Sequence, residues 1–286
     1  MPRISYVNGQ YIRHAQAAVH VEDRGYQFAD AIYEVVIIVD GRMVDGDLHF
    51  ERMERSLREI RIGMPFSRAL FRMKIDELLR LNRLKSGALY IQVSRGVAPR
   101  DHRPPSGIVP SVVMTVRPLR APPAALLEQG AAVISVADIR WKRPDIKSVG
   151  LLPNILAKDD AVRSGVYEAW QIDDAGFVTE GTSTNAWIVL GDRLVTHPPA
   201  AAILNGVTRL ALLKIAAAEG LTVEERPFSI DEARSASEAF LTSTTAFIVP
   251  IVRIDDTTIG DGRPGPRTLA LLAAYREHVR HVGAPG

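Results

Sequence analysis

The first part of the chain alternates short apolar runs with tight turns. Asn8-Gly9 and Asp40-Gly41 each separate two such runs. Asn, Asp and Gly accept the positive φ angles that two-residue hairpin turns require. We therefore predict two β-hairpins, one joining residues 4–6 to 10–12 and the other joining residues 33–39 to 42–44.

Apolar residues spaced three or four apart follow the second hairpin, which is the period of an amphipathic helix. They predict a helix at residues 47–61 and another at residues 67–84. Alternating segments at residues 87–95 and 111–116 then predict two more strands.

Beyond a proline-rich segment at residues 117–123, strands and helices alternate. The expected strands are 131–136, 168–172, 186–189, 194–196, 221–225 and 239–242, and the expected helices are 153–163, 206–219 and 266–279. This pattern predicts an α/β (α+β) chain with two domains, residues 1–120 and 121–286. Because ligands tend to bind in clefts between domains, we expect the active site there.

The amino-acid composition restricts the classes of function and partner that we expect for this protein. Apolar content of 47% and charged content of 24% are typical of a globular protein, and the net charge of +2 gives no reason to expect a nucleic-acid partner. Cysteine is absent, so we expect no disulfides and no thiolate nucleophile. The histidines lack metal-ligand spacing, and no apolar run reaches membrane-spanning or signal-peptide length. We expect a cytoplasmic protein without a metal or a membrane partner.

Two segments carry residues that suit pyridoxal phosphate (PLP) chemistry. Lys147, one of six lysines, precedes the predicted helix at 153–163, and Glu180 follows in the polar stretch 178–185, which we interpret as a turn. A lysine can hold the cofactor aldehyde as a Schiff base and then move the substrate proton, while a carboxylate keeps the pyridine nitrogen protonated. Because loop lysines and turn acids are usually surface residues, this pair alone decides nothing.

Two further segments are suited to receive a phosphate. Gly206 and Thr208 lie at the start of a predicted helix, where unpaired backbone N–H groups bind anions. Ser243 and Thr244 follow a strand that is predicted to be buried. The alternative is that these residues are ordinary helix caps and turns.

The order of these segments resembles the fold-type IV (class IV) PLP-dependent aminotransferases, especially their D-amino acid (D-alanine) aminotransferase branch. The similarity extends nearly end to end. It includes Glu22-Asp-Arg-Gly-Tyr-Gln-Phe28 and the blocks at 32–35, 94–96, 99–102, 138–141, 145–158, 178–185, 196–198, 206–209 and 241–245.

The resemblance implies the two-domain fold, PLP, and ping-pong transfer of an amino group from a D-amino acid to a 2-oxo acid through a Lys147 Schiff base. In this scheme the implied cofactor-binding residues are Arg52, Glu180, Val207, Thr208, Ser243 and Thr244. Arg52 would pair with the phosphate, and we expect nearby His49 to be a packed residue.

The resemblance also implies how the substrate carboxylate is bound. Tyr33, Arg100 and His102 would form the binding site, and Glu34 would line the same pocket. In the family the arginine and histidine come from the neighbouring subunit, so a homodimer is implied. The family usually has glycines around Asp30, where this chain has alanines at 29 and 31. If this backbone needs a positive φ, the position of Tyr33 changes.

Several alternatives share the cofactor residues. Lys147 and Glu180 would serve an L-branched-chain aminotransferase, an (R)-amine transaminase or an aminodeoxychorismate lyase equally well, and only the carboxylate site favours the D-amino acid branch. A PLP-binding protein without turnover is a further alternative. Lys142 is a weaker rival to Lys147 because no helix follows it directly.

Overall fold

The computed structural model describes residues 3–119 and 122–283, and the chain divides into two compact units. Unit 1 comprises Met1–Arg120, Ile146–Gly150 and Val279–Gly286, and unit 2 comprises Ala121–Asp145 and Leu151–His278. The predicted boundary between residues 120 and 121 lies outside the described residues. Segment Ile146–Gly150, which carries Lys147, groups with unit 1 although it lies beyond that boundary in the chain.

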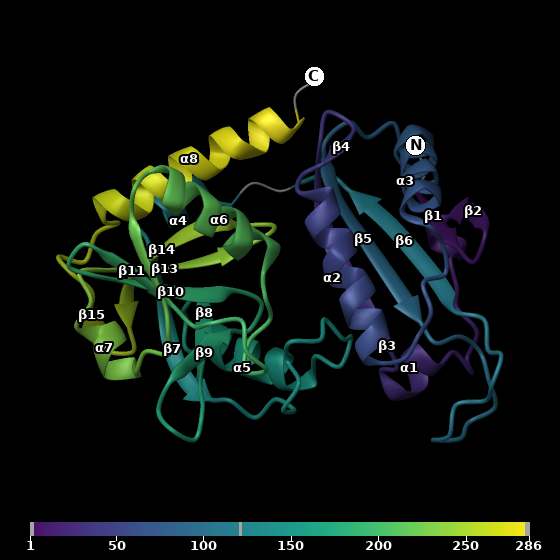
Figure 1. Ribbon diagram of the computed structural model, residues 1–286, viewed down its shortest axis with the longest axis horizontal. Coiled ribbons are helices and arrows are strands. Elements are labelled where there is room, and N and C mark those ends of the chain that lie inside the picture. The colour runs from purple at the N-terminus through teal and green to yellow at the C-terminus, as the bar shows by residue number, and fades with distance from the viewer. Residues whose placement is uncertain (1–2, 120–121, 284–286) are drawn as a thin grey trace. The chain divides into compact units, whose positions relative to one another are not determined.

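Within the described residues, unit 1 contains a six-stranded antiparallel sheet of order β2-β1-β6-β5-β3-β4 (Figure 1). Both predicted hairpins are confirmed, since β1 pairs with β2 and β3 with β4. The strands are β1 Ile4–Val7, β2 Gln10–Arg13, β3 Ala31–Val39, β4 Arg42–Met43, β5 Gly87–Ser94 and β6 Ser111–Arg117.

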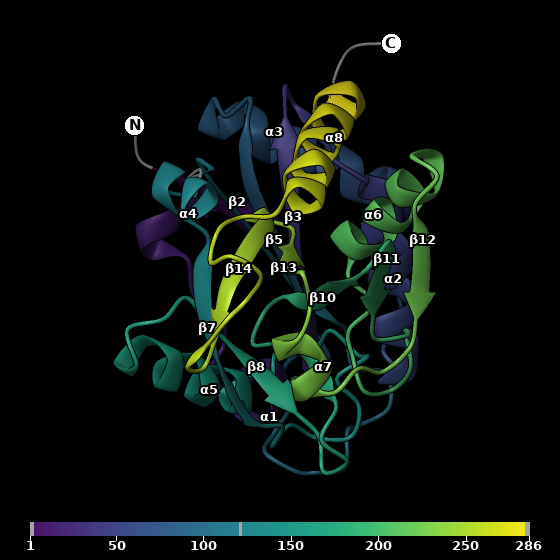
Figure 2. The ribbon, with the colours of Figure 1, turned by 90° about the vertical axis from the view of Figure 1, so that its left-hand side faces the viewer.

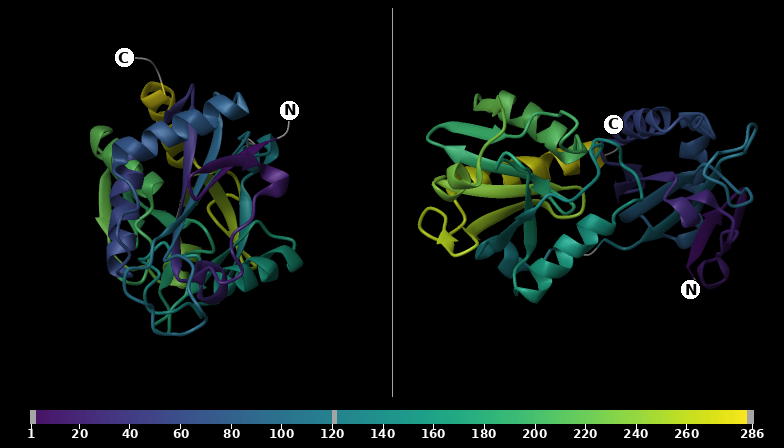
Figure 3. Two further views of the ribbon diagram at one scale, coloured as in Figure 1. Left: turned by 90° about the vertical axis from the view of Figure 1, so that its right-hand side faces the viewer. Right: turned by 90° about the horizontal axis from the view of Figure 1, so that it is seen from below.

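Helices α2 (Gly46–Glu59) and α3 (Arg68–Asn82) pack on this sheet, as the blue ribbons in the left view of Figure 3 show. The predicted start of α3 is confirmed, because Ser67 Oγ accepts from the backbone N of Leu70 at 3.2 Å. Apolar residues of both helices form one core with alternate residues of the strands. Each large side chain that is fully buried there stabilises the fold by about 1.5–3 kcal/mol.

Strand periodicity gives β3 two different faces. Ile32 and Val36 belong to the core beneath the helices, so Glu34 between them is a charged residue on the core side. Tyr33 lies on the opposite face. A short helix, α1 (Arg24–Phe28), precedes β3 and was not predicted, since five residues are too few to show a helical period.

Segment Ile146–Gly150 runs along the edge of β3. Tyr33 N donates to Lys147 O at 3.0 Å, and Ser148 forms a β-bridge with Ile32. Ile146 is buried in the unit 1 core. These contacts explain why a segment distant in sequence belongs to unit 1.

Unit 2 contains a mixed sheet of nine strands within the described residues, ordered β12-β11-β10-β13-β14-β7-β8-β9 with β15 beside β14 (Figure 2). Strands β11–β12, β14–β7 and β7–β8 pair in parallel and the remaining pairs are antiparallel. The strands are β7 Ala131–Ala137, β8 Glu168–Ile172, β9 Val178–Gly181, β10 Asn185–Leu190, β11 Arg193–Thr196, β12 Thr222–Glu225, β13 Glu238–Ser243, β14 Phe247–Ile254 and β15 Thr257–Thr258.

The helices of unit 2 include those predicted and two short ones that were not, α4 and α7. Their bounds are α4 Ala124–Glu128, α5 Leu152–Arg163, α6 Val207–Ala218, α7 Ile230–Arg234 and α8 Pro266–Gly283. The last turn of α8, from Val279 on, groups with unit 1. Helix α5 packs through Ala157 and Ala161 against β7 and β8. Among the described residues, no helix is long and apolar enough to cross a membrane.

One predicted element is wrong. The stretch around Glu180 was interpreted as a turn, but Val178–Gly181 forms strand β9, which pairs with β8. The turn is confined to the residues that follow, where Gly181 N donates to Thr184 O at 2.8 Å. Threonine and glutamate alternate too briefly in this stretch to reveal a strand, and pairing with β8 decides the outcome.

Candidate functional site

Lys147 lies in the loop before α5, and its backbone is fixed on both sides. Its N donates to Ser56 Oγ of α2 at 3.3 Å, and its O accepts from Tyr33 N. The Nζ atom lies 4.3 Å from the centroid of the Tyr33 ring, within cation–π range. Tyr33 in turn stacks on Tyr90 with centroids 5.8 Å apart. The lysine amine is thereby held against the face of β3 that carries Tyr33.

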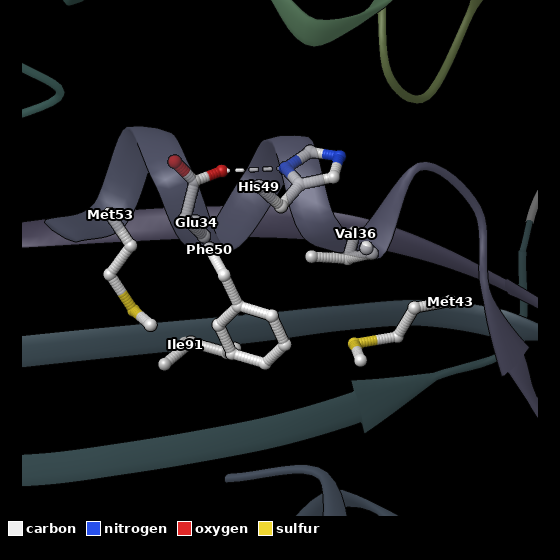
Figure 4. Close-up of a pocket in the computed structure, with 8 residues that line it drawn as sticks. Glu34, Val36, Met43, His49, Phe50, Met53 and Ile91 are labelled. Atoms are coloured by element: carbon white, nitrogen blue, oxygen red, sulfur yellow. Dashed lines mark hydrogen bonds and ion pairs between the residues drawn. The ribbon is translucent and has the colours of Figure 1, made fainter. Parts of the chain in front are cut away.

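Glu34, on the core face of β3, binds two side chains of α2. Its carboxylate accepts from Arg52 Nε and Nη2 at 2.8 and 2.7 Å, and from His49 Nδ1 at 2.8 Å. Figure 4 shows Glu34 and His49 pointing toward one another above Phe50 and Ile91. The apolar packing around them leaves no space for a water molecule. His49 is therefore packed, as predicted, and also makes a polar contact that the sequence did not reveal.

Protonation in this cluster follows from burial and charge. Burial alone would raise the Glu34 pKa, but Arg52 and His49 lower that pKa to about 2. Burial, together with the charges of Arg52 and Lys147, lowers the His49 pKa although the Glu34 carboxylate opposes this shift. Near neutral pH the cluster therefore contains a carboxylate, a guanidinium and a neutral imidazole that donates through Nδ1, so the formal charges of these three groups sum to zero.

Glu180 is the centre of a second buried cluster, in unit 2. Its side chain is 6% exposed and pairs with Arg140 Nη1. Asn185 Nδ2 donates to Glu180 Oε2 at 3.0 Å, and Leu204 N donates to the same oxygen at 3.1 Å. The carboxylate is thus bound from three separate segments.

Arg140 serves two carboxylates at once. It donates to Asp138 through Nε and Nη2 at 2.9 and 2.6 Å, in addition to its contact with Glu180. Burial alone would lower the Arg140 pKa, but the Asp138 hydrogen bonds and the Glu180 charge raise it above its usual value. Burial alone would raise the Asp138 pKa, and the bonds from Arg140 lower it instead. Asp138, Arg140 and an ionised Glu180 together carry one formal negative charge.

The predicted phosphate segments lie at the same end of the unit 2 sheet as Glu180. Helix α6 begins after Gly206, and a Cβ on this glycine would lie 2.1 Å from Asn185 Oδ1. Asn185, which also binds Glu180, pairs in the sheet with Thr242, the residue before Ser243. The packing of Asn185 is thus a local reason for glycine at 206, in addition to any close approach of a ligand.

Thr208 and Ser243 already have contacts within unit 2. Thr208 is 3% exposed, and its Oγ1 accepts from Tyr275 Oη at 3.4 Å. Ser243 Oγ accepts from Ala246 N at 3.2 Å and so shapes the turn that contains Thr244. Val207, at the first position of α6, is buried. The hydroxyl groups therefore stabilise the local structure and also offer hydrogen-bond donors.

Arg100 and His102 lie on an exposed loop of unit 1 and gather around one aromatic ring. The Arg100 guanidinium carbon is 4.6 Å from the centroid of Phe28, and the His102 ring is 5.6 Å from the same centroid. Tyr33 belongs to another group of contacts, with Tyr90 and Lys147. Within one chain, the structure does not bring the three predicted carboxylate ligands into one contact group.

The alanine at position 29 adopts the conformation for which glycine is suited. Ala29 ends α1 with φ 55° and ψ 25°, in the left-handed region, whereas Ala31 begins the extended strand β3. Tyr33 nevertheless stays in register, opposite Gln92 of β5. The strain is thus confined to the corner that leads into β3, where it costs about 1–2 kcal/mol.

Sequence reasoning missed most partners of the predicted site residues. Glu34 was given no bond to Arg52, and Arg140 and Asn185 received no role although both lie in blocks that carry the resemblance. A carboxylate on the buried face of an apolar strand was a usable signal for Glu34, because such a charge needs a partner. For Arg140, the only signal in the sequence was its place in the block at 138–141 that carries the resemblance.

Comparison with known proteins identifies the family. The family described as "Amino-transferase class IV" matches residues 31–254. D-alanine aminotransferase from Bacillus licheniformis is 40% identical over 272 residues, with 95% of both chains covered. D-alanine aminotransferase from Staphylococcus haemolyticus is 38% identical over 274 residues, with 96% of this chain and 97% of the relative covered.

Solved structures agree with this match. The branched-chain amino acid aminotransferase of Escherichia coli superposes with a TM-score of 0.90 at 26% identity, covering 97% of this chain and 94% of the other. The branched-chain aminotransferase of Thermoproteus uzoniensis with norvaline gives a TM-score of 0.88 at 25% identity, covering 99% and 96%. The predicted resemblance and the fold-type IV fold are confirmed, and the chain belongs to the class IV aminotransferase family.

Proposed function

We propose that this protein is a PLP-dependent aminotransferase that moves the amino group of a D-amino acid, such as D-alanine, to a 2-oxo acid. One observation of the structure carries the proposal: the Lys147 amine is held 4.3 Å from the Tyr33 ring by backbone pairing to β3. Membership of the class IV family supports the type of reaction. The relatives that are D-alanine aminotransferases support the class of substrate.

The side chains present fit PLP. Lys147 supplies an amine, Glu180 a buried carboxylate, and the first turn of α6 an N-terminus with the Thr208 hydroxyl. When bound, the cofactor supplies a ring that accepts the electrons released at the substrate carbon. We assign the phosphate to Arg52, Val207, Thr208, Ser243 and Thr244.

Lys147 would act as the base of the reaction. In the proposed scheme its Nζ takes up the proton released at the substrate Cα and would then deliver that proton to the carbon of the bound cofactor that carries the amino group. A base can do this repeatedly only if its position is fixed, and the bonds from Ser56 Oγ and Tyr33 N to the Lys147 backbone supply that constraint. Lys142, the rival lysine, is exposed to solvent, where a long flexible side chain keeps many rotamers.

Arg52 would pair with the phosphate while Glu34 holds its guanidinium. The Nε and Nη2 atoms of Arg52 form a bidentate pair with Glu34. In this assignment Glu34 keeps Arg52 in a single orientation, which lowers the entropy lost when the anion binds.

Glu180 would hold the proton on the cofactor ring nitrogen. The formal charges of Asp138, Arg140 and Glu180 sum to minus one, so a protonated ring nitrogen would bring the cluster to neutrality. Asn185 and the Leu204 backbone fix the carboxylate in place before the cofactor arrives. This preorganisation would favour the charged ring throughout the reaction.

Arg100 and His102 would bind the substrate carboxylate together with Tyr33, across a homodimer. Both loop residues are exposed in this chain and contact Phe28 rather than Tyr33, which supports their acting on a partner subunit. Helix α5 also exposes an apolar face, with Leu152 and Ile155 66% and 60% exposed. An apolar face of this kind is typical of a protein–protein contact and supports the homodimer.

An L-branched-chain aminotransferase is the second candidate, because solved structures of that activity superpose closely on this chain. To decide, the cofactor absorbance of the wild-type holoenzyme is followed on addition of D-alanine or of L-leucine. We expect D-alanine to convert the cofactor and L-leucine to do so far more slowly. Efficient conversion by L-leucine alone would contradict the D-amino acid proposal and leave the family assignment intact.

The carboxylate assignment is tested on the same assay with Arg100→Ala. Loss of a charge-assisted pair should reduce kcat/KM for D-alanine roughly ten- to a hundred-fold. Arg103→Ala, an exposed arginine of the same loop, is the matched control and should behave like the wild type. An equal loss in both variants would mean that general loop charge, and not a specific contact, matters.

A further inference from the structure

The loop that carries Arg100 and His102 is bound to helix α1 through its backbone and through its side chains. Arg24 of α1 donates through Nη1 to Asp101 O at 2.5 Å and through Nη2 to His102 O at 3.3 Å. Phe28, one turn later, contacts the side chains of Arg100 and His102. The same short helix thus contacts both the backbone and the side chains of the loop.

The side chain of Arg24 is itself held in place by burial and by an ion pair. It is 4% exposed, and its Nε donates to Asp30 Oδ2 at 2.9 Å. Asp30 is held in turn by Arg95, whose Nε and Nη2 donate to the two carboxylate oxygens at 2.6 and 2.9 Å. Arg24 is thus a buried arginine that donates to two carbonyl groups of a loop whose residues 99–107 are exposed.

The charges around Phe28 favour an anionic ligand. Arg24 and Arg100 bring two positive charges to this ring, and Asp30, the partner of Arg24, is shared with Arg95. The Arg24 guanidinium carbon also lies 4.7 Å from the Phe28 centroid. Cations gathered at one ring repel one another, and a carboxylate bound by the outermost of them relieves that repulsion.

We propose that Arg24 and Phe28 are positioning residues for the binding of the substrate carboxylate. Arg24 sets the path of the loop through its two carbonyl bonds, and Phe28 sets the direction of the Arg100 guanidinium and the His102 ring. The inference rests on the proposed function, in which Arg100 and His102 bind that carboxylate. Neither Arg24 nor Phe28 touches the substrate in this scheme, so they govern binding of the carboxylate and not proton transfer at Lys147.

The test uses the holoenzyme and three measurements: steady-state kinetics with D-alanine, the Kd of propionate from the cofactor absorbance, and trypsin cleavage after Arg100. Phe28→Leu should raise the KM and the propionate Kd roughly five- to ten-fold, since two aromatic contacts are lost. Arg24→Lys keeps the charge but loses the fork and should raise them roughly ten-fold. In both variants kcat should stay within about two-fold and trypsin should cleave the loop faster.

Three controls separate positioning from folding. Phe28→Tyr keeps the ring and should behave like the wild type. Tyr26→Leu removes an exposed aromatic residue from the same helix and should change none of the three measurements. The Kd of PLP for the apoprotein should be unchanged in every variant, because the proposal assigns Arg24 and Phe28 no part in binding the phosphate.

Two outcomes overturn different claims. If Arg100→Ala loses propionate binding while Phe28→Leu and Arg24→Lys retain it, the positioning proposal is wrong and the carboxylate site stands. If Arg100→Ala itself binds propionate as the wild type does, the carboxylate site of the proposed function is wrong, and with it the role of the helix. Unchanged trypsin cleavage in Arg24→Lys would also count against the proposal.

Discussion

Glu34 in unit 1 and Glu180 in unit 2 are both buried glutamates paired with an arginine, yet their surroundings differ. Glu34 receives its bonds from two side chains of one helix, and the charges of its cluster sum to zero. Glu180 receives bonds from a strand residue, a loop arginine and a backbone amide, and Arg140 is shared with Asp138. The formal charges of Glu34, Arg52 and the neutral His49 sum to zero, whereas those of Asp138, Arg140 and Glu180 sum to minus one.

Burial and ion pairing therefore do not by themselves mark a functional carboxylate. A neutral, dry cluster such as that of Glu34 orients a neighbour, here Arg52, whereas a cluster with a residual charge can act on a ligand. We therefore expect loss of Glu34 to be felt mainly in stability and in phosphate binding, and loss of Glu180 mainly in catalysis.

The largest effect should come from Lys147, which lies in unit 1 but belongs to neither glutamate cluster. Lys147→Ala removes the proposed base and should lower the transamination rate on the order of 10⁴-fold. The thermal unfolding midpoint should change little, because the backbone bonds to Ser56 and Tyr33 remain. Lys142→Ala is the matched control. If Lys147→Ala turned over substrate like the wild type, another residue would be the base, and the assignment of proton transfer to this part of unit 1 would be weakened.

The second-largest effect should be a loss of stability in Glu34→Gln. The change leaves Arg52 buried beside a neutral amide and should reduce the free energy of unfolding by about 3–5 kcal/mol. Denaturant unfolding of the apoprotein measures this loss directly. A variant as stable as the wild type would contradict the description of the Glu34 cluster as a structural ion pair.

The same cluster predicts a pH dependence of wild-type stability. The Glu34 pKa falls from 4.5 to about 2 on folding, so its contribution of about 3 kcal/mol is complete above pH 4.5 and is lost as the pH falls toward 2. The His49 pKa is also lowered, so the unfolded chain takes up that proton first and stability already declines below about pH 6.5. In Glu34→Gln the decline between pH 4.5 and 2 should be shallower.

Glu180→Gln should affect catalysis more than folding. Loss of the charge that holds the ring proton should reduce kcat roughly ten- to a hundred-fold, with a smaller change in PLP affinity. Glu168→Gln is a matched control, since Glu168 is a carboxylate of β8 that is 1% exposed and accepts from Thr182 Oγ1 at 2.6 Å. Equal losses of kcat in the two variants would show that unit 2 needs any buried carboxylate and not Glu180 in particular.

The smallest effect should come from the two alanines beside Asp30. Ala29→Gly relieves a left-handed alanine and should stabilise the protein by up to about 1 kcal/mol. Ala31→Gly, in the extended and buried start of β3, should instead destabilise it by about 0.5–1 kcal/mol. Stability changes of opposite sign in the two variants would separate backbone strain at Ala29 from the contribution of the Glu34 cluster. Changes of the same sign would refute the argument that Ala29 is strained by its left-handed conformation.

Sequence patterns were sufficient for much of the fold. Asn8-Gly9 and Asp40-Gly41 located both hairpins, and the spacing of apolar residues located α3, because each of these signals is local in the sequence. Strand β9 and helix α1 were missed. The former is defined by its pairing with β8, and the latter is too short to have a period.

For the candidate site, the residue types and their order, including Lys147, Glu180 and Arg52, could be taken from the amino-acid sequence. The partners of these residues depend on the folded chain. Pairing along β3 brings Lys147 to Tyr33, and the alternation of β3 directs Glu34 toward Arg52. The physical reason is that local propensities act over a few residues, whereas the charge, burial and hydrogen bonding of a site depend on segments that meet only after the chain has folded.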